Sequence, residues 1–156
     1  MNESMMDRVP PHNHEAEQSV IGAIFLEPQA LITASEILMP DDFYRTAHQK
    51  IFQTMIRLSD QGKAIDVVTV TEELSAKKEL EDVGGLSYLS ELANAVPTAA
   101  NIAHYAKIVE EKALLRRLIR TATKIVEDGY TREDEVEVLL SEAEKKMMEV
   151  ANRKNA

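Results

Sequence analysis

The residues that could carry out chemistry in this chain do not form a recognisable active site. ATP binding through a P-loop needs the pattern GxxxxGK followed by Ser or Thr, because glycine amides cradle the phosphates and the lysine reaches them. The one Gly-Lys pair, Gly62-Lys63, is followed by Ala64, and Arg57 stands where the first glycine would be. No GxGxxG motif is present either. We therefore predict no nucleotide-hydrolysing site, and no cofactor, in these residues.

The histidines and carboxylates also fail the tests for metal or acid–base chemistry. His12-Asn13-His14 has the letters of a nuclease motif, but it lies in a polar leader without further ligands at a workable spacing. We interpret it as a helix cap with solvent-exposed imidazoles. His48 and His104 stand singly on predicted helices, where we expect surface or partly buried positions. The many carboxylates lie on charged faces, without the apolar pocket that separates catalytic pKa values.

Composition and charge narrow the class of protein. The chain has 156 residues, 44% hydrophobic, with no cysteine, which excludes disulfides and cysteine-ligated metals. It shows no signal-peptide pattern and no apolar run of membrane-spanning length, so we expect a cytoplasmic protein. Net charge is −9, and residues 1–98 hold 7 basic against 16 acidic residues. Such an acidic surface repels phosphate backbones, although ordinary solubility explains it equally well.

Short helices separated by proline and glycine are expected over residues 1–98. Asn13 is a candidate N-cap for the first, and Gly62 a candidate C-terminal cap for a helix over 48–61. The segment 67–71 has the β-branched content of a strand. Asp66 is however a good N-cap, acidic residues follow, and no second strand is available for pairing. We therefore predict a helix there.

A long helical hairpin is predicted over residues 99–151. The run 101–128 contains no proline, and Gly129 is expected to end it. Thr131, with Asp134 three residues later, resembles the N-cap of a second helix over 132–150. A connection this short makes the two helices antiparallel. The predicted fold is all-α, a globule over 1–98 followed by this hairpin, with 152–156 as the start of a linker.

The apolar pattern of the hairpin suggests an interface. The second helix has one stripe: Val136, Leu139, Leu140, Ala143, Met147 and Val150. The first helix has a main row, Ile108, Leu115, Ile119, Ala122 and Val126, and a flanking row, Leu114, Leu118 and Ile125, rotated by roughly 80°. Two rows are wider than one partner helix covers. The surplus either packs on the globule or forms a contact with another chain.

Charge on the hairpin is also segregated. Residues 107–124 hold six basic and two acidic residues, and residues 127–149 hold nine acidic and three basic. The opposite signs can pair within one hairpin or between two, and each exposed pair contributes about 0.2–1 kcal/mol. A basic face over Lys112, Arg116, Arg117, Arg120 and Lys124 is an alternative nucleic-acid surface. It lacks interleaved aromatic residues, so direct DNA binding is the weaker hypothesis.

Several ordered blocks resemble the N-terminal domain of bacterial DnaB-type replicative DNA helicases. They are PPHNHEAEQSVIGAI at 10–24, DFYR at 42–45, GGLSYL at 84–89, VPTAANI at 96–102 and LRRLI at 115–119. His48, Ile51-Phe52, Tyr105-Ala106 and Ile108-Val109 continue the similarity. The likeness covers nearly the whole chain, from about residue 8 to about residue 150.

This resemblance implies a non-enzymatic role in a larger assembly. In that family the hairpins pair between subunits and build a trimer of dimers, a collar above a hexameric ring. The RecA-like motor, which uses ATP and Mg²⁺ and moves on single-stranded DNA, is expected outside these residues. The collar recruits the C-terminal domain of primase, and a helicase loader is a further possible partner. A stand-alone regulatory module that binds helicase partners is the alternative.

Particular residues follow from this interpretation. For the contact with primase or a second subunit we predict Tyr88, Ile119 and Ile125, with Leu114 and Leu118 as alternates. Tyr88 follows a Gly-Gly turn and offers an aromatic anchor, which interfaces favour. For packing within the hairpin we predict ten residues: Ile108, Leu115, Ala122, Val126, Val136, Leu139, Leu140, Ala143, Met147 and Val150.

Overall fold

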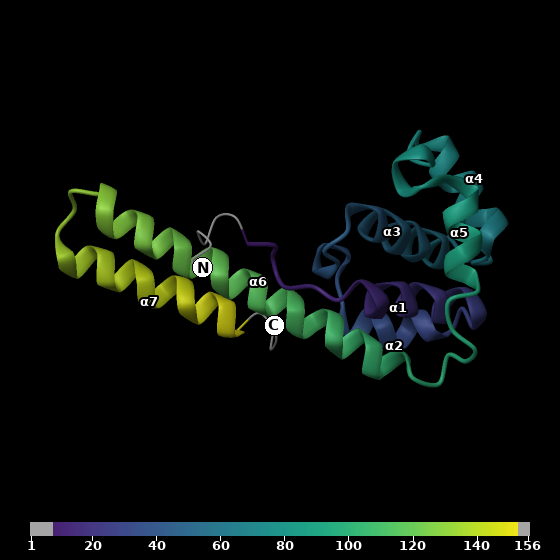
Figure 1. The fold of residues 1–156 in the computed structure, drawn as a ribbon, viewed down its shortest axis with the longest axis horizontal. Helices are drawn as coiled ribbons and strands as arrows, with labels where there is room; N and C mark the ends of the chain where they lie inside the picture. Colours follow the sequence, from purple (N-terminus) through teal and green to yellow (C-terminus); the bar gives the residue numbers. More distant parts are fainter. Residues whose placement is uncertain (1–7, 153–156) are drawn as a thin grey trace. The chain divides into compact units, whose positions relative to one another are not determined.

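Every regular element in the computed structural model, which describes residues 8–152, is a helix (Figure 1). This confirms the all-α prediction. Contacts divide the chain into two compact units, one over His12–Ala113 and one containing Leu114 onward with the residues up to Pro11. We call them the globular unit and the hairpin unit. Of the predicted linker 152–156, only Asn152 is described, as the last residue of a helix, and the rest lies outside the described residues.

Seven α-helices and two short 3-10 turns are resolved within the described residues. They are α1 (His14–Leu26), α2 (Ala30–Ile37), η2 (Pro40–Asp42), α3 (Thr46–Asp60), α4 (Val67–Ala76), η3 (Glu81–Val83), α5 (Gly85–Ala93), α6 (Ile102–Thr131) and α7 (Val136–Asn152). The division between the two units falls inside α6, between Ala113 and Leu114. None of the described helices combines the length and apolarity needed to span a bilayer.

The predicted helix starts in the globular unit are confirmed by their caps. The Asn13 side chain accepts a hydrogen bond from the Ala16 amide at 2.9 Å, which starts α1. The Asp66 side chain accepts from the Thr69 amide at 2.8 Å. This cap, with no strand in the described range to pair with, resolves the ambiguity at 67–71 in favour of helix. Gly62 follows α3 with a φ of +69°, as a C-terminal glycine requires.

One apolar core holds the globular unit together. It is built almost entirely from aliphatic side chains, with Phe43 and Phe52 in contact at a centroid distance of 5.1 Å. The largest fully buried apolar side chains are Phe43, Phe52, Ile21, Ile24, Ile51, Met55, Leu58, Leu74, Leu89 and Leu92. They come from α1, α3, α4, α5 and the turn before α3, so the core joins segments far apart in the sequence. The first part of α6 adds Ala106 and Val109.

A chain of buried polar side chains crosses this core. Glu17 and His48 are each 1% exposed, and the Nδ1 of His48 lies 2.8 Å from the Glu17 carboxylate. The Nε2 of His48 lies 2.7 Å from the Tyr88 hydroxyl. We call these three residues the Glu17–His48–Tyr88 chain. The expectation that His48 is a surface or partly buried residue is therefore wrong. Helical periodicity placed it beside polar neighbours and could not show that hydrogen-bond partners from α1 and α5 meet it in the core.

The leader histidines are also less exposed than expected. His12 stacks on Tyr44 with a centroid separation of 4.2 Å, and His14 stacks on His48 at 5.4 Å. Burial lowers the pKa of His14, and the neighbouring Arg45 adds to the shift. The helix-cap interpretation of Asn13 holds, but the imidazoles on either side of it are half-buried and not free in solvent.

The turn of the hairpin differs from the prediction. Gly129 does not end the first helix, because α6 continues through it to Thr131. The Arg132 amide still donates to the Asp128 carbonyl at 3.0 Å, and the Thr131 hydroxyl bonds back to the Glu127 carbonyl. Thr131 therefore closes α6 and does not cap α7, which starts at Val136. A glycine inside a helix costs about 1 kcal/mol. In a helix of this length, the continued hydrogen bonds outweigh that cost.

Two helical glycines allow a matched test of packing. A Cβ on Gly22 would lie 2.7 Å from the Leu92 carbonyl oxygen and 3.0 Å from the Ala95 Cβ, whereas a Cβ on Gly129 would meet nothing within 4 Å. Gly22→Ala should lose about 1–3 kcal/mol by overpacking against a helix-propensity gain of about 1 kcal/mol, giving net destabilisation. Gly129→Ala should stabilise by about 0.5–1 kcal/mol. Urea denaturation measures both. A Gly22→Ala variant as stable as Gly129→Ala would contradict the close α1–α5 approach.

Candidate protein-interaction surface

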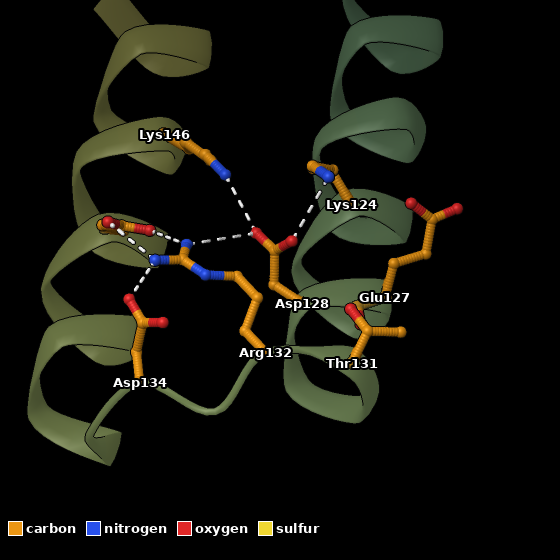
Figure 2. Close-up of polar contacts among 8 residues, drawn as sticks. Lys124, Glu127, Asp128, Thr131, Arg132, Asp134 and Lys146 are labelled. Carbon is orange, nitrogen blue, oxygen red and sulfur yellow. Dashed lines mark hydrogen bonds and ion pairs between the residues drawn. The ribbon is translucent and has the colours of Figure 1, made fainter.

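The hairpin unit is held at its turn by a network of ion pairs. The last turns of α6 and the first turns of α7 lie side by side, joined by residues 132–135 (Figure 2). Asp128 on α6 receives Lys146 from α7 at 3.2 Å and Lys124 from its own helix at 3.2 Å. Because Lys146 and Asp128 belong to different helices, this pair sets the register between them. The predicted antiparallel hairpin is thus present in the structure.

The charged groups in this network shift one another's pKa values. Desolvation alone would raise the pKa of Asp128, but the ammonium groups of Lys146 and Lys124 outweigh it and hold the pKa below its ordinary value. Arg132, in the connecting loop, pairs with Glu142 of α7 and with Asp134. Glu142 and then Asp134 raise the pKa of its guanidinium, which stays charged. Ion pairs among residues of α6, of the connecting loop and of α7 therefore hold the turn together.

The apolar stripe of α7 is only partly covered. None of the residues of α7 is buried. Leu139, Ala143, Met147 and Val150 are half-buried, as expected for a row facing α6. Val136 and Leu140 are 70% and 59% exposed, although the sequence analysis placed them in the same packing stripe. One neighbouring helix covers about half of this stripe and leaves its edge in solvent.

The two rows of α6 have roles different from those predicted. Leu115 and Val126 were assigned to packing within the hairpin, but they are 40% and 53% exposed. Ile125 was assigned to a partner, yet it is half-buried and lines a groove of about 200 Å³ with Val136 and Leu139 of α7. The reason is the side of α6 on which Asp128 lies. Asp128 follows Ile125 by three residues, so the pairing of Asp128 with Lys146 turns Ile125 toward α7.

The remaining assigned residues fall into three environments. Ile108 lies in the globular unit, where it is half-buried against the core. Leu114 and Ala122 are half-buried on α6. Leu118 and Ile119 are 40% and 43% exposed, and their contact role stays a prediction.

An uncovered apolar face on α6 results from this arrangement. It consists of Leu115, Leu118, Ile119, Val126 and Tyr130, each at least 40% exposed, and we call it the outer apolar face. At 3.6 residues per turn these five side chains fall within about 120° of arc. Tyr130, 88% exposed, was missed by the sequence analysis because it lies next to the glycine that was expected to end the helix. Contiguous apolar surface of this kind marks an interaction site.

Tyr88 differs from the other predicted contact residues. It belongs to α5 in the globular unit and is half-buried. Its hydroxyl faces the interior, where it lies 2.7 Å from His48 and accepts from the Gln18 side-chain amide at 3.2 Å. The phenol is therefore not a free hydrogen-bonding group on the surface. Burial raises its pKa.

The basic face proposed for nucleic acid is incomplete in the structure. Arg116 is 7% exposed and donates to the Pro11 carbonyl at 2.8 Å. At 7% exposure, most of the Arg116 side chain is withdrawn from the solvent-facing surface that a phosphate backbone would contact. Within residues 8–152 no group of three or more histidine, aspartate or glutamate side chains is arranged to hold a metal ion. In the described part of the hairpin unit, the outer apolar face is the candidate binding surface.

Removing the central charge of the turn tests its role in register. Asp128→Asn should lower the melting temperature by a few degrees, because Lys124 and Lys146 lose their shared partner. Since its pKa is depressed, the Asp128 contribution is present above the ordinary value of 3.8 and is lost as the pH falls below it. Thermal melts at neutral and acidic pH measure this. Glu127→Gln removes the same charge from a side chain that points away from the network and serves as the control (Figure 2). Equal melting temperatures for the two variants would contradict the clamp.

Comparison with known proteins identifies the family. Residues 9–111 match the model of the DnaB-like helicase N terminal domain. The chain is 64% identical over its whole length to the replicative DNA helicase DnaB of Geobacillus stearothermophilus, and 66% identical over 155 residues to the replicative DNA helicase DnaC of Bacillus subtilis (strain 168). It covers 34% of each of these relatives, about a third of their length.

Two solved structures extend the comparison to the fold. The N-terminal domain of DnaB helicase from Mycobacterium tuberculosis is 40% identical, with a TM-score of 0.86, covering 90% of this chain and 99% of that one. The structure of a DnaB-like replicative helicase and its interactions with primase is 28% identical, with a TM-score of 0.73, covering 88% of this chain and 31% of that one. The chain belongs to the DnaB family of replicative DNA helicases, of which it is the N-terminal domain.

Proposed function

We propose that this domain is a non-catalytic assembly and docking module, which pairs with a second copy of itself and binds the C-terminal domain of primase. The observation that carries the proposal is the outer apolar face, whose five side chains are exposed on one side of α6. No P-loop sequence is present in the chain to support catalysis. ATP and Mg²⁺, and passage of single-stranded DNA, belong in this proposal to the motor part of the longer helicase.

Pairing between copies is supported by the chemistry of the hairpin. An apolar helix face buries most surface against another elongated helix, and each 100 Å² covered contributes about 2.5 kcal/mol before the costs of association. The basic run 107–124 and the acidic run 127–149 can also pair between two hairpins. In the full-length ring, three such dimers would form the collar, which would act in the cytoplasm at the replication fork.

Primase docking is supported by the comparisons and by exposed residues. A structural relative with a TM-score of 0.73 is a DnaB-like replicative helicase whose structure was described together with its interactions with primase. On this chain, Ile119 and Leu118 are exposed apolar candidates on α6, and α5 around Tyr88 is the candidate in the globular unit. A helicase loader is a second possible partner for the same surfaces. The rival hypothesis, a regulatory module that blocks assembly, predicts a chain that stays monomeric.

Self-association is tested by placing a charge on the outer apolar face. Leu115→Asp should shift the molar mass toward the monomer at concentrations where the wild type is dimeric, because the carboxylate must be desolvated at the interface. Val138→Asp is the control, since Val138 on α7 is 44% exposed and Leu115 is 40% exposed. Sedimentation equilibrium gives the mass. A wild type that is strictly monomeric at high concentration would overturn the assembly role.

Primase docking is tested by titration with the primase C-terminal domain. Ile119→Asp and Tyr88→Ala should each weaken binding by about tenfold or more, as expected for interface anchors worth 1–2 kcal/mol. Ile32→Asp on α2, where Ile32 is 67% exposed, controls for the added charge. Calorimetry gives the affinity, and circular dichroism checks the fold. Unchanged affinity in two correctly folded variants would show that these residues are not the docking site.

A further inference from the structure

The hydroxyl of Tyr88 is engaged at both of its hydrogen-bonding faces inside the globular unit. It lies 2.7 Å from the His48 Nε2 and 3.2 Å from the Gln18 Nε2, and the Tyr88 and His48 rings stack at 5.9 Å with an interplanar angle of 17°. A partner protein that touches α5 therefore meets carbon atoms of the Tyr88 ring and not its polar end.

The direction of these hydrogen bonds follows from Glu17, at the other end of the Glu17–His48–Tyr88 chain. Burial alone would raise the pKa of Glu17, but hydrogen bonds from His48 and from the Tyr44 and Arg45 amides outweigh it and keep the pKa below its ordinary value. The ionised carboxylate only accepts, so the His48 Nδ1 carries a hydrogen and donates. With the hydrogen on Nδ1, the Nε2 can accept from the Tyr88 hydroxyl, whose oxygen accepts from Gln18. In this order each of the printed contacts pairs a donor with an acceptor.

The Glu17–His48–Tyr88 chain therefore connects α5 to α1 and α3 by hydrogen bonds. Glu17 and Gln18 belong to α1, His48 to α3 and Tyr88 to α5. The buried residues of α5, Leu89 and Leu92, make apolar contacts, which tolerate rotation better than hydrogen bonds do. α5 also starts without a side-chain cap, on Gly84 at a φ of +105°.

The start of α5 is coupled to the same residue. A Cβ on Gly84 would lie 2.8 Å from the Tyr88 Cβ, so the turn before the helix lies directly against the Tyr88 side chain. The side of α5 left in solvent carries Leu86, 54% exposed, with Ser87 and Glu91. The orientation of this outer side depends on where the Tyr88 hydroxyl is held.

We propose that Tyr88 is a positioning residue, which orients the outer side of α5 for a docking protein through the Glu17–His48–Tyr88 chain. The proposal rests on the proposed function, in that α5 is taken as part of the primase-docking surface. The partner would recognise apolar and polar groups on α5, of the kind that Leu86 and Glu91 supply. Glu17, 1% exposed, would then influence docking without touching the partner.

This last point supplies the test, because Glu17 cannot be a contact residue. Tyr88→Phe removes one oxygen atom and keeps the ring, and Glu17→Gln is an isosteric change at the buried end. Each should weaken primase-domain binding by about 3-fold to 10-fold, the loss expected for one hydrogen bond. Each should also speed hydrogen exchange of the α5 amides in the free chain. The double variant should lose less than the two single losses combined, because both changes break the same chain.

Three other outcomes would overturn the proposal, and each would indicate a different role for Tyr88 or a failure of the proposed function. If Tyr88→Phe weakens binding and Glu17→Gln does not, the hydroxyl contacts the partner directly. If only Tyr88→Ala weakens binding, the ring is a simple contact. If the wild type fails to bind the primase domain, the proposed function fails, while the exchange experiment still decides whether the chain positions α5. Should Glu17→Gln fail to fold, Tyr88→Phe removes the hydroxyl that meets His48, and unchanged α5 exchange in that variant would equally overturn the proposal.

Discussion

Each helix of a two-helix hairpin can cover only one stripe of the other, and this geometric constraint governs the hairpin unit. α6 carries two apolar rows, and α7 takes the side on which Ile125 and Asp128 lie. The other row, with Leu115, Ile119 and Val126, is left in solvent. An elongated hairpin that buries none of the residues of α7 has little core of its own. Covering the outer apolar face with another protein would supply the burial that the hairpin lacks.

Ion pairs and apolar contacts have different tasks in this unit. Asp128 is itself buried, but its basic partners Lys124, Arg132 and Lys146 stay partly in solvent, so each pair contributes little to stability. It nevertheless decides which of two nearly equivalent rows faces α7, because a carboxylate between Lys124 and Lys146 is satisfied in one helix rotation only. Specificity of orientation comes from the charges, and in the proposed function the affinity for a partner comes from the surface that this orientation leaves exposed.

The globular unit solves the opposite problem, since its core is complete and contains a buried charge. Glu17 is stable there because two backbone amides and His48 donate to it. The hydrogen bonds that satisfy the carboxylate also connect α1, α3 and α5, so the group that is costly to bury also specifies how three helices meet. A surface on α5 that binds another protein would be only as well ordered as this interior chain.

The sequence by itself determined which segments form helices, because the chemistry that decides this is local. The caps at Asn13 and Asp66, the glycine after α3 and the periodic apolar rows all act over three to four residues, so they are legible without a fold. The family resemblance also depends on the sequence alone, because ordered blocks of residues carry it. Tertiary structure alone decided which row of α6 faces α7, that α6 continues past Gly129, and that His48 is buried between Glu17 and Tyr88. The facing of α6 and the burial of His48 depend on partners 18 to 40 positions away, namely Lys146 for Asp128 and Tyr88 for His48. Periodicity fixes the angle between residues on one helix, but only contact with another element fixes where that helix points.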